Sequence, residues 1–117
     1  MALDLTPLRW DWSPVVSGDT YPAATITASA ETETLERVRI SIFASGSTTP
    51  ALQLDSDTSG ITITTSAAPA WSYTIDTIEE VPLTGGEYSY QLETTTTAGT
   101  RRTRFAGTWK ILSDIIP

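Results

Sequence analysis

The chain has 117 residues, the length of a single domain, and it contains neither cysteine nor histidine. The lack of these residues excludes disulfides, thiolate metal sites, thiol nucleophiles and the general base that enzymes use most often. Seven Lys and Arg against fourteen Asp and Glu give a formal net charge of -7, which disfavours contact with nucleic-acid phosphates and anionic lipid. We therefore expect no cofactor, no nucleic-acid partner and no membrane partner.

The first residues carry no recognisable targeting signal. The stretch Met-Ala-Leu-Asp-Leu-Thr-Pro at positions 1–7 has neither the basic region nor the apolar region of a signal peptide. No apolar run approaches the roughly 18 residues of a membrane-spanning helix. These features predict a protein made in the cytoplasm.

Apolar and polar residues alternate with a period of two in a series of short segments, which is the pattern of half-buried β-strands. Threonine, the commonest residue, favours strands because its branched side chain packs well on a pleated surface. Clusters of Gly, Ser, Asp and Pro separate the segments. The pattern predicts one all-β domain over residues 1–117, an immunoglobulin-like antiparallel β-sandwich of seven or eight strands. The alternating segments are, in chain order, 24–28, 37–42, 52–54, 61–63, 71–75, 88–92 and 105–111.

One short helical turn is also predicted. Thr77-Ile-Glu-Glu80 fits a helix capping box, and Pro82 would end the helix after a single turn.

The segment that begins at Gly86 has the layout of a tyrosine corner, in which a tyrosine hydroxyl bonds to the backbone a few residues upstream. Tyr88 is the expected corner residue. Tyr90 stands where an antibody domain places its second cysteine, and we expect its ring to fill the core there. The tryptophan that antibody domains carry on strand C is absent, since that segment is Val38-Arg-Ile-Ser-Ile42.

Arg101, Arg102 and Arg104 form the one basic cluster of the chain. Strict alternation places Arg102 and Arg104 on the face opposite Phe105 and Trp109, and so predicts that they point to solvent. A nucleic-acid site would need interleaved aromatic residues and a wider positive field, which the acidic chain lacks. We expect a solvated hairpin end or a contact for an acidic neighbouring subunit.

The acidic residues do not form the pattern of a catalytic or metal site. The stretch Asp55–Gly60 resembles the first half of a calcium loop, but the bidentate glutamate required at its twelfth position is Ser66, which favours a β-turn. Carboxylates that lie close together in turns, such as Glu79 and Glu80, do not face each other across a cleft as glycoside hydrolysis requires. The sequence thus predicts that the protein is not an enzyme.

Two further pairs of apolar residues are candidate subunit contacts. Trp10 and Trp12 flank Asp11 and so share one face of a strand, where we expect them to fill the core. An aromatic platform for a sugar or a partner protein is the alternative. Ile115 and Ile116 follow the last predicted strand, and either dock on another protein or fold back on the domain.

From about residue 60 onward the sequence resembles a small immunoglobulin-like domain of bacteriophage and prophage proteins, similar to the N-terminal domain of phage baseplate upper proteins. The resemblance is good over the last half of the chain and looser over the first half, where Gly18-Asp-Thr-Tyr-Pro-Ala-Ala-Thr-Ile-Thr27 is similar to the opening of the family. The matching positions are Ser59–Thr62, Glu79-Glu80, Leu83–Leu92, Gly99 and Gly107–Ile111.

This resemblance implies a virion structural protein of the tail, baseplate, neck or fibre attachment. Such a protein acts by assembling with other phage structural proteins, and we expect it to form a homo-oligomer within the virion. The chain ends at Pro117, directly after the domain, and we therefore expect a free-standing connector or decoration subunit. A carbohydrate- or receptor-binding module on a virion or cell surface is the alternative.

Overall fold

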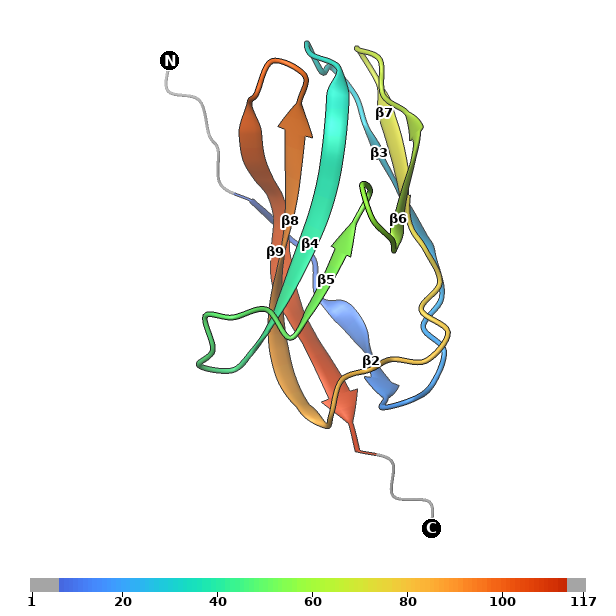
Figure 1. The fold of residues 1–117 in the computed structure, drawn as a ribbon, viewed down its shortest axis with the longest axis vertical. Coiled ribbons are helices and arrows are strands. Elements are labelled where there is room, and N and C mark those ends of the chain that lie inside the picture. The colour runs from blue at the N-terminus through green and yellow to red at the C-terminus, as the bar shows by residue number, and fades with distance from the viewer. Residues whose placement is uncertain (1–6, 114–117) are drawn as a thin grey trace.

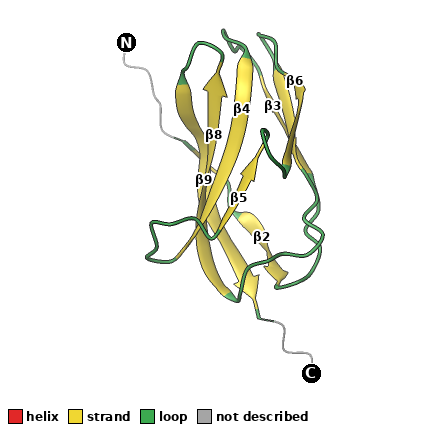
Figure 2. Cartoon of the chain, in the orientation of Figure 1, coloured by secondary structure: helices red, strands yellow, loops and turns green. Residues whose placement is uncertain are grey.

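A computed structural model describes residues 7–113 as a sandwich of two β-sheets (Figure 1). Strands and loops make up the whole of this part of the chain, without a helix (Figure 2). The all-β sandwich predicted by the period-two pattern is therefore confirmed. The strands are β1 (Leu8–Arg9), β2 (Trp12–Val16), β3 (Ala24–Ala28), β4 (Leu35–Ala44), β5 (Leu52–Asp55), β6 (Ile61–Thr65), β7 (Trp71–Ile75), β8 (Gly86–Thr96) and β9 (Arg101–Leu112).

The larger sheet has six strands in the order β1-β9-β8-β4-β5, and β2 also pairs with β9. Strands β4, β5, β8 and β9 are antiparallel to their neighbours, whereas β1 and β2 run parallel to β9. The smaller sheet has three antiparallel strands in the order β3-β7-β6. The turn from Asp55 to Gly60 carries the chain from β5 in the larger sheet to β6 in the smaller one.

The core lies between the sheets and is built by the alternating side chains that the sequence marks as apolar. Alternate residues are buried from Val38 to Ile42 in β4, throughout β7 and from Tyr88 to Thr96 in β8, because side chains on one face of a strand recur with a period of two. Each aliphatic or aromatic side chain of this size stabilises the fold by roughly 1.5–3 kcal/mol when fully buried. The most completely buried large apolar residues are Val38, Ile40, Ile42, Trp71, Tyr73, Val81, Tyr90, Leu92, Trp109 and Ile111.

The predicted tyrosine corner is present. The hydroxyl of Tyr88 donates a hydrogen bond to the carbonyl oxygen of Thr84, at 2.8 Å and four residues upstream. Tyr90 is 1% exposed, so its ring fills the core as expected.

The helical turn predicted at residues 77–80 is wrong. Ile78 instead forms an isolated antiparallel bridge with Tyr21, with N···O distances of 2.9 Å and 2.8 Å in the two directions. The backbone groups that would begin a helix are therefore satisfied by a partner distant in sequence, and Glu79 and Glu80 follow as bends.

A β-bulge in β9 changes which residues face the core. The pairing of β8 with β9 shifts between Leu92 and Glu93, so that Leu92 lies opposite Phe105 while Glu93 lies opposite Thr103. Arg104 is the extra residue of β9 at this point. Because one added residue inverts the alternation, Arg102 pairs with Thr94, whose side chain is buried between the sheets. The prediction that Arg102 and Arg104 lie on the solvent face is therefore wrong.

Candidate binding cleft

The three arginines of the basic cluster occupy three different environments. Arg101 is exposed at the hairpin end, with its Nε 3.1 Å from a carboxylate oxygen of Glu93. Arg104 lies at the inner side of β9, and its side chain is only 20% exposed. Arg102 is half-buried, and its Nε atom is buried without a hydrogen-bond partner. The three arginines are close together in the sequence, but they differ in exposure and in their partners.

Arg104 is held by several contacts at once. Two of its nitrogens donate to the carboxylate of Glu31 at 3.0 Å and 3.2 Å, and its Nε donates to the hydroxyl of Thr94 at 3.1 Å. Its guanidinium lies 5.0 Å from the ring centre of Trp71, within the range of a cation–π interaction. Arg104 thus joins β9 to the loop that follows β3 and to β7 of the opposite sheet.

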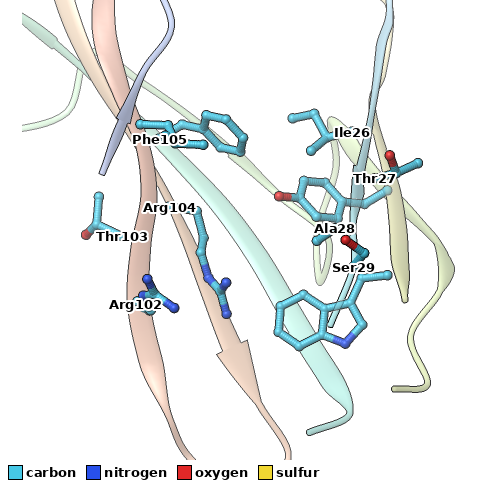
Figure 3. Close-up of a pocket in the computed structure, with 11 residues that line it drawn as sticks. Ile26, Thr27, Ala28, Ser29, Arg102, Thr103, Arg104 and Phe105 are labelled. Carbon is cyan, nitrogen blue, oxygen red and sulfur yellow. The ribbon is translucent and has the colours of Figure 1, made fainter. Parts of the chain in front are cut away.

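Beside Arg104 the two sheets leave a cleft with a volume of about 260 Å³. Arg104 and Phe105 project from β9 toward Ile26 and Ala28 of β3, and Thr103 points away (Figure 3). Trp71 and Tyr73 of β7 form buried walls of the cleft, and Leu8 of β1 also lines it. Burial raises the pKa of Tyr73 to about 12. The cleft combines apolar walls with the guanidinium groups of Arg102 and Arg104.

The comparisons with known proteins identify no family. No family model and no curated protein matches the chain. Among solved structures, the chain is similar to a family 123 glycoside hydrolase from Clostridium perfringens, with 12% sequence identity and a TM-score of 0.49. The match covers 94% of this chain and 24% of the hydrolase chain. A likeness at this level carries no inference about what this chain does.

The two tryptophans predicted as candidate contacts belong to an aromatic cluster within the domain. Trp12 is 6% exposed and Trp10 is half-buried, with their ring centres 5.8 Å apart. Trp12 packs edge-on against Trp109 at 4.9 Å and lies 4.7 Å from the ring of Tyr90. The hydroxyl of Tyr90 also donates a hydrogen bond to the carbonyl oxygen of Trp10. Core filling, the favoured interpretation, therefore describes Trp12 well.

The remaining candidate contacts, Ile115 and Ile116, lie outside the described residues.

The acidic residues of the crossover turn are engaged in structural contacts. Asp55 is 6% exposed, accepts hydrogen bonds from Nε of Arg37 at 3.0 Å and 3.2 Å, and accepts another from the backbone N–H of Asp57 at 3.0 Å. The Arg37 guanidinium lowers the pKa of Asp55 below its ordinary value. Within residues 7–113 no group of three or more Asp or Glu is placed to hold a metal ion, and no helix long and apolar enough to cross a membrane occurs. The turn thus serves as the crossover between the two sheets.

Sequence reasoning missed the cleft because its charged wall depends on the bulge. With strict alternation, Arg102 and Arg104 point outward and leave nothing charged between the sheets. The partner of Arg104 is Glu31, in the loop that follows β3, and no local sequence pattern connects it with β9. A break in the register of the last hairpin is the signal that points to this arrangement.

Proposed function

We propose that this protein is a bacteriophage virion structural subunit of the tail, baseplate, neck or fibre attachment, which acts by assembling with other proteins of the particle. In this proposal the chain contributes a rigid sandwich whose surface contacts its neighbours. The sequence resemblance to phage immunoglobulin-like domains suggests the virion, and the positions of the matching residues support a scaffold role.

One observation carries the scaffold role: the residues of the matching segment hold the fold together. Tyr88 forms the corner, and Nε1 of Trp109 donates to the carbonyl oxygen of Ser13 at 3.0 Å, which fixes β2 against β9. Gly107 lies directly under the chain between β1 and β2, since a Cβ built there would be 2.2 Å from the carbonyl oxygen of Trp10. Because the matching residues make contacts within the domain, they support a protein that acts through its overall surface.

The direct test is the composition of purified particles. Antibodies raised against the purified protein, together with quantitative mass spectrometry of gradient-purified virions, should detect it in a fixed copy number that matches a symmetric assembly. Immunogold electron microscopy should then place it at one defined region of the particle. Its absence from intact virions of a phage that encodes it would refute the proposal.

The alternative of a carbohydrate-binding module predicts a different result. Binding on a glycan array that is lost with Trp10→Ala would favour that function, because the platform interpretation depends on this ring. The structure packs Trp10 against Phe105 with ring centres 5.8 Å apart, and no observation on the described residues favours a sugar there. We therefore retain the assembly function as the proposal.

A further inference from the structure

Arg102 carries a positive charge that nothing in the described part of the chain balances. Each of the other arginines of residues 7–113 has a carboxylate oxygen within ion-pair distance, whereas Arg102 has none. Its Nε–H is buried and makes no hydrogen bond. A buried donor without a partner is energetically unfavourable, and more so when the group is charged. Arg102 therefore offers a charge-assisted hydrogen bond to an external carboxylate.

The cleft beside Arg102 also leaves apolar surface uncovered. Leu8 pairs with Phe105 and therefore faces the same inner side of the larger sheet, yet it is 66% exposed. Ile26 and Ala28 point inward from β3 but are only partly buried, in contrast to the fully buried inward residues of β7. The inner surface is thus incomplete along this side of the sandwich.

Two strand edges border the same opening. Strand β3 pairs only with β7, so its other edge is unpaired within residues 7–113. On the opposite side, β1 pairs with β9 only at Phe105 and Ala106, so the first residues of β9, from Arg101 to Arg104, have no described neighbour beyond β8. An unpaired edge presents backbone N–H and C=O groups to any extended chain that reaches it.

We propose that the cleft binds an extended, acidic segment of a neighbouring protein, which adds as a strand to the free edge of β3 and places one carboxylate against Arg102. Backbone hydrogen bonds to β3 supply part of the affinity, and alternate side chains enter the cleft. The inward positions flanking the carboxylate carry aliphatic residues, which cover Leu8, Ile26 and Phe105. The proposal rests on the proposed function insofar as this neighbour belongs to the same particle.

A peptide fits these features better than an acidic sugar does. A sugar ring stacks on an open aromatic face, and the wall residue Trp71 is only 2% exposed, with Arg104 over its ring. The opening instead offers a strand edge, aliphatic side chains and one guanidinium. These groups match the period-two side chains and the backbone of an extended peptide.

The test uses blocked seven-residue peptides in a titration followed by NMR. The first probe is acetyl-Thr-Leu-Thr-Glu-Thr-Val-Thr-amide, with companions that move the glutamate to each of the other inward positions. Binding should shift the backbone amides of residues 26–28 and the Nε–H signal of Arg102. Arg102→Gln should weaken binding at least about tenfold, the loss expected for a charge-assisted hydrogen bond. Arg101→Gln is the matched control and should change the affinity less than about twofold, since Arg101 lies outside the cleft.

Two altered probes separate the parts of the proposal. A peptide with Gln in place of Glu should bind at least about tenfold more weakly, and a peptide N-methylated along one edge should lose binding because it cannot pair with β3. Thermal unfolding should show that Arg102→Gln is at least as stable as the parent protein, because the substitution removes an unbalanced charge. This measurement shows that any loss of peptide binding does not reflect misfolding.

Several results would overturn the inference. These are equal binding of the Glu and Gln peptides, unchanged binding to Arg102→Gln, shifts located away from β3, or equal shifts with glucuronate alone. Self-association that Arg102→Gln abolishes would identify a second copy as the occupant and would also contradict the proposal. Peptide binding is measured on the isolated protein and particle composition on virions, so failure of this inference and failure of the proposed function are separate outcomes.

Discussion

Arg104 is the residue that most strongly joins the two sheets at the cleft. Its guanidinium and the carboxylate of Glu31 are 20% and 14% exposed, and the two groups form a bidentate pair. A partly buried pair of this kind gains from low local screening, but the loss of one member leaves the other desolvated without a partner. The contact with Trp71 adds a further stabilising interaction.

We therefore expect Arg104→Gln to lower the free energy of unfolding by about 2–3 kcal/mol, measured by urea denaturation at neutral pH. The double variant Arg104→Gln with Glu31→Gln should recover part of this loss, because it leaves no unpaired charge. Arg101→Gln should cost less than about 1 kcal/mol, since the Arg101 side chain is 62% exposed and Glu93 keeps its pair with Arg39. Equal losses for Arg101→Gln and Arg104→Gln would contradict this account of the cleft.

At the scale of elements, the pairing of β1 and β2 with β9 depends on a close backbone approach. Trp10 donates its backbone N–H to the carbonyl oxygen of Ala106 at 3.0 Å, and the carboxylate of Asp11 accepts from the backbone N–H of Thr108 at 3.0 Å. Gly107 lies between these two contacts and leaves room for the carbonyl of Trp10. The hydrogen bond from the backbone N–H of Thr108 also lowers the pKa of Asp11.

We expect Gly107→Ala to destabilise the protein by about 3 kcal/mol, because the added methyl group meets backbone atoms that side-chain rotation cannot relieve. Gly46→Ala is the control: it has a positive φ of 77° but no atom within 4 Å of the added methyl group, and should cost about 1 kcal/mol. Gly107→Ala should also increase proteolysis within residues 7–16, which Gly46→Ala should not. Similar effects of both substitutions would show that the approach of Trp10 is unimportant.

The hairpin of β8 and β9 shows what the sequence predicts and where simple alternation fails. Strand positions, the core face of β8 and the tyrosine corner follow from period-two patterns and local chemistry. The bulge does not, because it depends on the relation between two strands. From Tyr88 to Thr95 the chain advances seven residues, while its partner advances eight from Arg101 to Trp109. One residue must be accommodated between them, and a pattern search along a single strand does not detect this mismatch.

The prediction of a helical turn at residues 77–80 was wrong for a related reason. A capping box reports a local preference, and Ile78 is engaged by Tyr21, which is distant in the sequence. Pairing partners of this kind are set by tertiary packing, which overrides a weak local propensity. The cleft and its unbalanced arginine belong to the same class of feature, because they arise only when β9, β3 and β7 come together.

At the scale of the whole molecule, the sandwich is closed differently at two places along the side formed by β1, β2 and β3. The described fold measures 53 × 29 × 21 Å, and its aromatic cluster packs Trp12 of β2 between Trp109 of β9 and Tyr21. Farther along the same side, β1 ends and the cleft begins, with Leu8 uncovered at its mouth. The molecule therefore has a well-packed region that supplies stability and an incomplete region that is available for a partner, which is the division expected of an assembly subunit under the proposed function.

The buried tyrosines give the whole molecule a characteristic response to alkaline pH. Burial raises the pKa of Tyr73 to about 12, whereas tyrosines of the unfolded chain titrate near 10. The folded state thus holds the proton more tightly, so the contribution of Tyr73 to stability is complete below pH 10 and is lost as the pH rises from 10 to 12. Burial raises the pKa of Tyr90 in the same direction.

We expect the free energy of unfolding, measured with urea between pH 8 and pH 11.5, to fall steeply only above pH 10. Tyr73→Phe removes one ionisable group and should reduce this decrease in the free energy of unfolding by about 2 kcal/mol over the range. The variant keeps the aromatic ring that packs in the core. Absorbance at 295 nm should show part of the tyrosine ionisation delayed in the folded protein and restored to pH 10 in urea. A Tyr73→Phe curve parallel to that of the parent protein would mean that the ring at this position is hydrated, and that the cleft wall is more open than the structure places it.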